Sequence, residues 1–125
     1  MLGNTDAVAT IAVKSVATAG KFYEGTLGLR PTGTNEPGVQ EYRSGNSRVL
    51  VYESRYAGTN QATAATWIVQ DGVEKVVAGL KGKGVVFEHY DMPGVTRKGD
   101  VHLTGRTKAA WFKDPDGNIL AIVGP

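Results

Sequence analysis

The two histidines of the chain, His89 and His102, are the side chains best suited to proton transfer near neutral pH. Four acidic or phenolic residues lie close to them in the sequence: Glu88, Tyr90, Asp91 and Asp100. Such a group could form an acid–base pair or a metal site. The separation of 13 residues between the histidines matches no recognised ligand spacing. A surface or hydrogen-bonded structural role is therefore the competing interpretation.

Glu53 is the other candidate for chemistry, because it follows Val49 and Val51 at strand spacing. If that face of the strand lines an apolar cavity, Glu53 would be placed for general acid–base catalysis. The alternative interpretation is that Glu53 lies at a strand end, where it is solvated or paired with Arg55.

The composition predicts one domain, 1–125, with a core of its own. The 14 basic and 12 acidic residues give a formal net charge of +2, and the basic residues are scattered, so we expect no nucleic-acid partner. There is no cysteine for disulfides or thiolate ligands. Neither a signal-like start nor an apolar run of about 20 residues is present, which favours a cytoplasmic protein without a membrane partner.

The elements that must position these residues come in two similar series. In the first, Ser15 is a plausible N-cap and Gly28 a helix end. The first series comprises a strand at 7–13, a helix at 16–27, a short strand near 29–34, and strands at 38–43 and 48–53 that turn at 45–46.

The second series repeats this order. Asp71 is the expected N-cap and Gly84 the expected end of its helix. The second series comprises strands at 64–69, 85–90, 109–113 and 119–123, a helix at 73–80, and a turn at 114–118.

The two series are related by a fixed offset of 56 residues. The matched pairs are Val13 and Val69, Ser15 and Asp71, Gly28 and Gly84, and Leu29 and Val85. The Gly-Asn turns at 45–46 and 117–118 are 72 apart, so the second copy is 16 residues longer, most naturally around 92–106. We interpret this insertion as a lid, or else as a surface or dimer-contact excursion.

The repeat predicts an α+β fold of two tandem βαβββ modules, about 1–60 and about 61–125. Neither module can bury both faces of its sheet alone. Pairing them would give a half-open barrel with helices outside and a cavity inside, and such a cavity is the natural ligand site.

Three stretches carry a resemblance to a known family: KFYEGTLGL from Lys21, the repeated strand–helix unit at Asp71, and WFKDPDGNILAI from Trp111. Together they resemble the vicinal oxygen chelate superfamily, which contains glyoxalases, bleomycin-resistance proteins and extradiol dioxygenases. The resemblance covers nearly the whole chain. It implies a glyoxalase-like fold and a homodimer.

The resemblance also implies where a divalent metal would be held. The matching positions are Val8, Ala64 and Ala121, and a fourth position in some members falls at Val49 or Val51. None of these side chains has a donor atom, whereas divalent cations need oxygen or imidazole ligands. We therefore expect no metal and no other cofactor.

Strand alternation turns the same positions into an expected cavity lining. By the resemblance, Trp111 matches a substrate-facing aromatic position of the fosfomycin-resistance members. By parity, Trp67 and Tyr52 would face the core instead. The expected lining is Val8, Thr10, Val49, Val51, Glu53, Tyr56, Ala64, Thr66, Trp111 and Ala121.

Three functional hypotheses follow. The first is a metal-independent protein that binds a small apolar or aromatic molecule in the cavity. The second is a glyoxalase- or dioxygenase-like enzyme, working either by metal-free acid–base chemistry through Glu53 and a histidine, or with displaced metal ligands. The third is a purely structural or partner-binding module, which predicts a filled cavity and fits poorly with four alanine or valine positions on the inner face.

Overall fold

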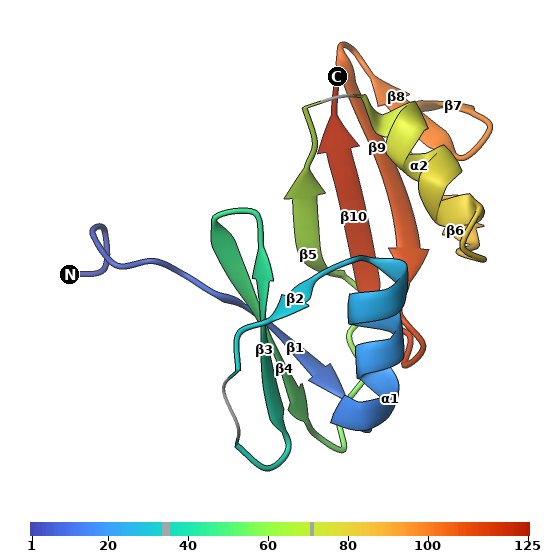
Figure 1. The fold of residues 1–125 in the computed structure, drawn as a ribbon. Coiled ribbons are helices and arrows are strands. Elements are labelled where there is room, and N and C mark those ends of the chain that lie inside the picture. Colours follow the sequence, from blue (N-terminus) through green and yellow to red (C-terminus); the bar gives the residue numbers. More distant parts are fainter. Residues whose placement is uncertain (34–35, 71) are drawn as a thin grey trace.

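The computed structural model describes residues 1–33, 36–70 and 72–125 and contains two βαβββ-like units (Figure 1). The first unit comprises β1 (Ala9–Val13), α1 (Val16–Gly20), the π-helix η1 (Lys21–Thr26), β2 (Arg30–Pro31), β3 (Val39–Ser44) and β4 (Ser47–Glu53). Its strands form a mixed sheet in the order β1-β4-β3-β2, in which β1 and β4 are parallel.

The second unit repeats this plan and adds a hairpin. It comprises β5 (Thr63–Ile68), α2 (Val73–Lys81), β6 (Phe87–Glu88), β7 (Thr96–Lys98), β8 (Val101–Thr104), β9 (Thr107–Lys113) and β10 (Ile119–Gly124). The sheet order is β5-β10-β9-β8-β7, with β5 and β10 parallel and β6 also paired to β9. The predicted α+β fold of two repeated units is confirmed.

The helix ends follow local chemistry. The hydroxyl of Ser15 accepts a hydrogen bond from the Thr18 amide, so the predicted N-cap of α1 is confirmed. The predicted helix continues as η1 and ends before Gly28, whose φ of 77° favours glycine. The expected cap at Asp71 lies outside the described residues, and Gly72 is the N-cap of α2. That helix ends at Lys81, slightly before Gly84.

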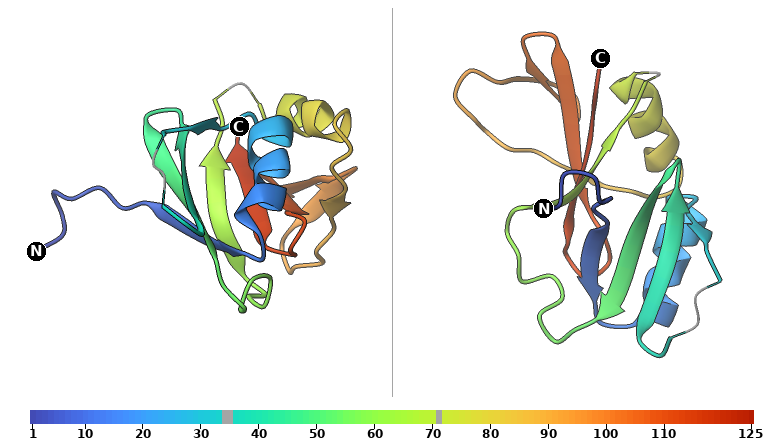
Figure 2. Two further views of the ribbon diagram at one scale, coloured as in Figure 1. Left: turned by 60° about the horizontal axis from the view of Figure 1, so that its bottom comes forward. Right: turned by 90° about the vertical axis from the view of Figure 1, so that its left-hand side faces the viewer.

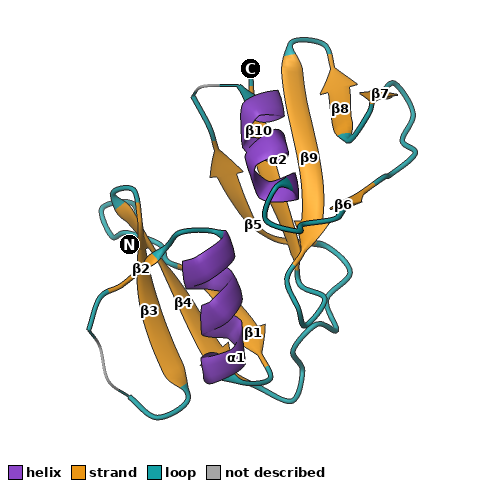
Figure 3. Ribbon diagram, turned by 45° about the vertical axis from the view of Figure 1, so that its right-hand side comes forward, coloured by secondary structure: helices purple, strands orange, loops and turns teal. Residues whose placement is uncertain are grey.

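Each helix covers one face of its own sheet (Figure 3). The largest fully buried side chains of the resulting core include Tyr23 from η1, Tyr42 from β3 and Phe112 from β9. The side chains of Ile11, Val13, Val49 and Val51, from β1 and β4, belong to the same core cluster. Burying this apolar surface under the helices is the main stabilising contribution to the fold.

The two units are joined by the turn after β9. The Tyr23 hydroxyl donates to Oδ2 of Asp114 at 2.7 Å, and the Asn118 side-chain amide donates to the Ala12 carbonyl at 2.7 Å. Asp114 Oδ1 also accepts the amides of Asp116 and Asn118. Burial and the adjacent Asp114 raise the pKa of Tyr23, so this phenol remains a donor. The turn therefore holds both modules together.

The insertion at 92–106 contains a β-hairpin, and whether it is a lid or a surface or dimer-contact excursion stays a prediction. Strands β7 and β8 pair with each other around Gly99, and β8 pairs with β9 through His102 and Ala109. The hairpin thus extends the second sheet. In the described part of the chain, no helix is long and apolar enough to cross a membrane.

Candidate functional site

Each sheet has one face that no helix covers, which we call the open face. Figure 2 (right) shows β1, β4 and β3 side by side with α1 behind them. In the first sheet Thr10 pairs with Leu50 on this face, next to the pair Ala12–Tyr52. In the second sheet Ala121 pairs with Thr66 on one side and with Trp111 on the other. Thr66, Trp111 and Ala121 therefore share the open face.

Two residues of the expected lining lie on the other side of the first sheet. Val49 and Val51 are buried beneath α1, so the expectation that they share a face with Thr10 is not met. The cause is the register, because Thr10 is opposite Leu50 and Val51 is opposite the buried Ile11. Tyr52 is correspondingly on the open face and exposed, not in the core as expected.

Glu53 ends β4 on the helix side of the sheet. Its Oε2 accepts a hydrogen bond of 3.0 Å from the Val16 amide, at the start of α1. The side chain is exposed, as the strand-end interpretation expects, but Arg55 instead donates to the Tyr56 hydroxyl and lies over its ring. Tyr56 is 61% exposed in the loop after β4. Glu53 thus stabilises the first turn of α1.

The open face of the second sheet carries a cluster of three rings. Trp111 of β9 contacts His102 of β8 edge-on, with ring centroids 4.9 Å apart. Tyr90, just after β6, contacts Trp111 at 5.5 Å and His102 at 6.2 Å. The edge-on geometry is favourable for aromatic pairs. We call Tyr90, His102 and Trp111 the ring cluster.

Hydrogen bonds fix the roles of these rings. The Tyr90 amide donates to Nε2 of His102 at 3.0 Å, so in the neutral ring Nδ1 carries the proton. His102 is only 1% exposed. In the described structure neither its Nδ1 nor the buried Tyr90 hydroxyl has a hydrogen-bond partner. The Trp111 indole donates to Thr63 Oγ1 at 3.1 Å. The cluster therefore holds two unmet hydrogen-bonding groups.

The second histidine has a different environment. His89 lies 2.7 Å from Oδ1 of Asp100, and Lys81 of α2 lies 2.7 Å from Oδ2 of the same carboxylate. The hydrogen bond from Lys81, followed by that from His89, lowers the pKa of Asp100 below its usual value. Among the described residues, neither histidine is hydrogen-bonded or ion-paired to Glu53. The three predicted catalytic residues are not brought together.

The positions that would hold a metal do not fit one. Val8 precedes β1, Ala64 lies at an irregularity in the β5–β10 pairing, and Ala121 is buried in β10. None offers a nitrogen or oxygen donor from its side chain. Across residues 1–33, 36–70 and 72–125, no group of three or more His, Cys, Asp and Glu residues is arranged to hold a metal ion.

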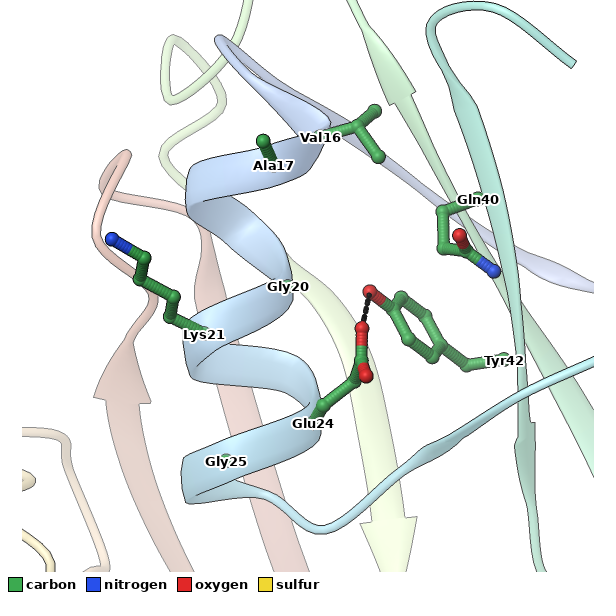
Figure 4. A pocket seen from close by; sticks show the side chains of 8 residues that line it. All are labelled: Val16, Ala17, Gly20, Lys21, Glu24, Gly25, Gln40 and Tyr42. Atoms are coloured by element: carbon green, nitrogen blue, oxygen red, sulfur yellow. Dashed lines mark hydrogen bonds between the residues drawn. The ribbon is translucent and has the colours of Figure 1, made fainter. Parts of the chain in front are cut away.

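A separate hollow of about 450 Å³ lies between the first helical segment and β3 (Figure 4). Tyr42 and Glu24 point toward each other across it, and the Tyr42 hydroxyl donates to the carboxylate at 3.0 Å. Burial, and then this carboxylate, raise the pKa of Tyr42. Lys21 points away from the pair. Because the Glu24 carboxylate is already hydrogen-bonded to Tyr42, we assign this pair a role in holding the helix against β3 and not in catalysis.

Two residues of this site were not predicted as lining residues: Tyr90 of the ring cluster, and Thr63, which accepts the hydrogen bond of Trp111. Tyr90 shares the face of Trp111 because Glu88, two residues earlier, pairs with Trp111. Thr63 is the first residue of β5 and lies opposite Ile119. Parity along 88–90 could have identified Tyr90 in the sequence, whereas the contact of Thr63 depends on how β5 and β10 pair.

Comparisons with known proteins agree with this architecture. The family model described as Glyoxalase/Bleomycin resistance protein/Dioxygenase superfamily matches residues 6–122. A glyoxalase family protein from Enterococcus faecalis is 17% identical, with a TM-score of 0.73 over 98% of this chain and 99% of that one.

Two further solved structures have the same fold. A lactoylglutathione lyase from Agrobacterium tumefaciens is 13% identical, with a TM-score of 0.70 over 97% of this chain and 93% of that one. A glyoxalase/bleomycin resistance protein/dioxygenase from Alicyclobacillus acidocaldarius is 15% identical, with a TM-score of 0.69 over 97% and 91%. At these identities the likeness concerns the fold alone. The comparison with curated proteins gave no match.

Proposed function

Because this chain belongs to the glyoxalase/bleomycin resistance protein/dioxygenase superfamily, we propose that it binds a small aromatic molecule beside Trp111, without a divalent metal. The observation that carries the proposal is the ring cluster, an aromatic surface on a sheet face that no helix covers. Flat apolar walls with a few polar groups are typical of small-molecule sites.

The unpaired groups of the cluster supply the polar part of recognition. A buried donor or acceptor without a partner costs about 1–3 kcal/mol. The Nδ1–H of His102 and the Tyr90 hydroxyl are both in this state. A ligand that separates the rings and presents an oxygen acceptor to His102 would recover this free energy. An aromatic phenol or carbonyl compound therefore fits better than an aliphatic one.

The side chains at the family's metal positions support binding without coordination. Ala121 lies directly opposite Trp111 in the β9–β10 pair. Its methyl group stands where other family members would place a carboxylate, so this position offers no donor atom to a metal. No step of the proposed binding needs a Lewis acid.

A metal-free acid–base enzyme is the second candidate, favoured by the unpaired Nδ1 of His102 beside the Tyr90 hydroxyl. Glu53 has no part in it, because its carboxylate binds the start of α1. A His102→Gln variant that still binds ligand but loses turnover would favour the enzyme over the binding protein.

The two tryptophans allow a sharp test, because they lie on opposite faces of the second sheet. Trp67 pairs with Ile122 of the core and donates to Ser44 Oγ, whereas Trp111 pairs with Ala121. Trp67→Phe leaves Trp111 as the only indole, and Trp111→Phe leaves Trp67. We expect 4-nitrophenol, an aromatic quencher, to quench the fluorescence of Trp111 in Trp67→Phe saturably. It should quench the fluorescence of Trp67 in Trp111→Phe only by collision.

The controls are the unliganded spectra and the thermal stability of both variants, which should show that each is folded. Saturable quenching of Trp67 instead, or of neither indole, would contradict the proposal.

A further inference from the structure

Three arginines form a row across the first sheet. In the antiparallel pairs, Arg30 of β2 lies opposite Arg43 of β3, and Arg43 lies opposite Arg48 of β4. Side chains directly opposite one another in such pairs have Cβ atoms about 4.5–5.5 Å apart. Three strands span about 10 Å. The row therefore brings three guanidinium groups within reach of one small molecule.

The arginines share the open face of the sheet. Their neighbours Leu29, Tyr42 and Val49 are all buried in the core under the first helical segment. Successive side chains of a strand point to opposite faces, so the three arginines point away from the core. All three are exposed.

The row is poorly neutralised by the protein. Its one ion pair is between Arg48 and Glu41, at 3.7 Å, and the other oxygen of Glu41 accepts the Thr32 hydroxyl. Within residues 1–33, 36–70 and 72–125, the guanidinium groups of Arg30 and Arg43 have no hydrogen bond or ion pair. Like charges directly opposite in a sheet are destabilising. The protein thus carries an electrostatic cost that its own contacts do not offset.

Three lysines elsewhere in the chain are ion-paired. Lys81 pairs with Asp100, Lys108 with Glu74, and Lys113 with Glu88. A net charge of +2 and this pairing do not make an extended basic stripe of the kind that follows a nucleic-acid backbone. Lys14, Lys75 and Arg106 also have no ion pair among the described residues, but they do not lie opposite another basic residue in a strand pair, as the three arginines do.

The surface at this place is hollowed. A cavity of about 510 Å³ is lined by Arg43 and Arg48, with Asn46 and Ser47 of the turn between β3 and β4. Val8 and the carboxylate-bearing Asp6 also line it. A second hollow of about 430 Å³, at the edge of the sheet next to Leu29 and Trp67, is lined by Arg30 and Arg43. Guanidinium groups bind phosphate oxygens in pairs of parallel hydrogen bonds.

We propose that the arginine row (Arg30, Arg43 and Arg48) binds a compact anion with several negative charges, of the oligophosphate class. Three guanidinium groups exceed what a single carboxylate can use. One row about 10 Å long fits a chain of two or three phosphates better than a polymer. The phosphates can belong to an inorganic oligophosphate or to a nucleotide, since both present the same oxygens.

Calorimetric titration of the whole chain with sodium tripolyphosphate at constant ionic strength tests the proposal. Arg43→Gln removes the central charge of the row. The matched control is Arg106→Gln, which removes the same charge from the exposed turn between β8 and β9. We expect Arg43→Gln to weaken binding by about tenfold or more, and Arg106→Gln to leave it within about twofold. Adenosine triphosphate in a parallel titration distinguishes the two sources of phosphate.

A second measurement guards against a merely unfolded variant. Arg43→Gln removes the repulsion of Arg43 by Arg30 and Arg48, so its Tm should exceed that of the wild type in low salt. The difference in Tm should decrease as salt is added, because salt screens the repulsion. Equal loss of tripolyphosphate binding in both variants would overturn the proposal, since it would reflect net charge alone. So would an Arg43→Gln Tm below that of the wild type, or binding of a DNA oligonucleotide without binding of tripolyphosphate. Tripolyphosphate carries no aromatic ring, so the outcomes with this ligand are independent of the proposed function.

Discussion

Tyr23 and Asp114 belong to the two most distinctive stretches of the sequence, FYEGTLGL and DPDGN, and a hydrogen bond of 2.7 Å joins them. Asp114 is 5% exposed, and in the described structure its carboxylate accepts four hydrogen bonds, from Tyr23, Asp116 and both nitrogens of Asn118. The sequence predicts the turn, because Asp, Gly and Asn favour it. It does not predict that the turn is the joint between the modules.

We expect Tyr23→Phe to lower the free energy of unfolding by about 1–3 kcal/mol, because the buried Asp114 carboxylate loses a donor. Urea unfolding measures this. Tyr52→Phe is the matched control, since Tyr52 is 37% exposed on the open face. Equal effects of the two substitutions would contradict the role assigned to the bond.

Asp100 gives a pH dependence of known sign. Lys81 and then His89 hold the pKa of this carboxyl below its usual 3.8, so the folded state favours the ionised form. The stabilisation is therefore present above pH about 4 and is lost as the pH falls through the lowered pKa. We expect Asp100→Asn to destabilise the protein at pH 6 and to have a smaller effect near pH 3, as followed by thermal unfolding. A constant difference at both pH values would argue against the pairing.

At the same scale, strand alternation predicts part of the candidate site. Thr66, Trp111 and Ala121 lie on one face, as the period of two requires. That they contact a ligand stays a prediction. Val49 and Val51 were assigned to the wrong face, because an alternating apolar strand fits a core as well as a cavity. Only the register with Ile11 decides between them.

Among the elements, the order and approximate bounds follow from periodicity and turn residues, but two features do not. The helix from Val16 changes to a π-helix at Lys21, which places Tyr23 on the core side and Glu24 against Tyr42. The hairpin of β7 and β8 is short and rich in polar residues, so its sequence resembles a loop. The π-helix and the hairpin both depend on contacts with distant parts of the chain, Glu24 with Tyr42 and β8 with β9.

The loop after β4 touches the turn after β9 at Gly58. This residue has a φ of 73°, and an added Cβ would lie 1.8 Å from the Asp116 carbonyl oxygen. Gly105 has a similar φ of 57° with open space around it. We expect Gly105→Ala to cost about 1–2 kcal/mol through its backbone conformation alone. Gly58→Ala should cost about 1–3 kcal/mol more through the steric clash. Chemical unfolding of both variants separates the backbone contribution from the steric contribution. Equal losses of unfolding free energy in the two variants would contradict the close contact at Gly58.

For the whole molecule, the 56-residue offset predicts two similar units, and the structure has two mixed sheets. The offset cannot say how the units pack, since that depends on contacts such as Asn118 with Ala12. β1 and β5 are in contact, but in the described residues they do not join into one hydrogen-bonded sheet. The open faces are therefore available to a ligand or a second copy.

We expect the protein to form a homodimer in which the second copy covers part of the open face. Ile68 of β5 is 72% exposed on that face, and burying it would favour association. Ile68→Glu should shift the mass measured by light scattering during gel filtration towards the monomer. Val86→Glu is the control, because Val86 is 78% exposed in the segment between α2 and β6, away from β5. A monomeric wild type, or equal behaviour of the two variants, would exclude this arrangement.

The central claim is that the chain binds an aromatic molecule at the ring cluster without a metal. The most direct measurement is the thermal shift caused by 4-nitrophenol on protein stripped with EDTA, repeated after adding Zn²⁺ or Mn²⁺. A ligand that binds only the folded state raises Tm. We predict the same rise with and without metal. A rise that requires stoichiometric metal, or none under any condition, would contradict the account.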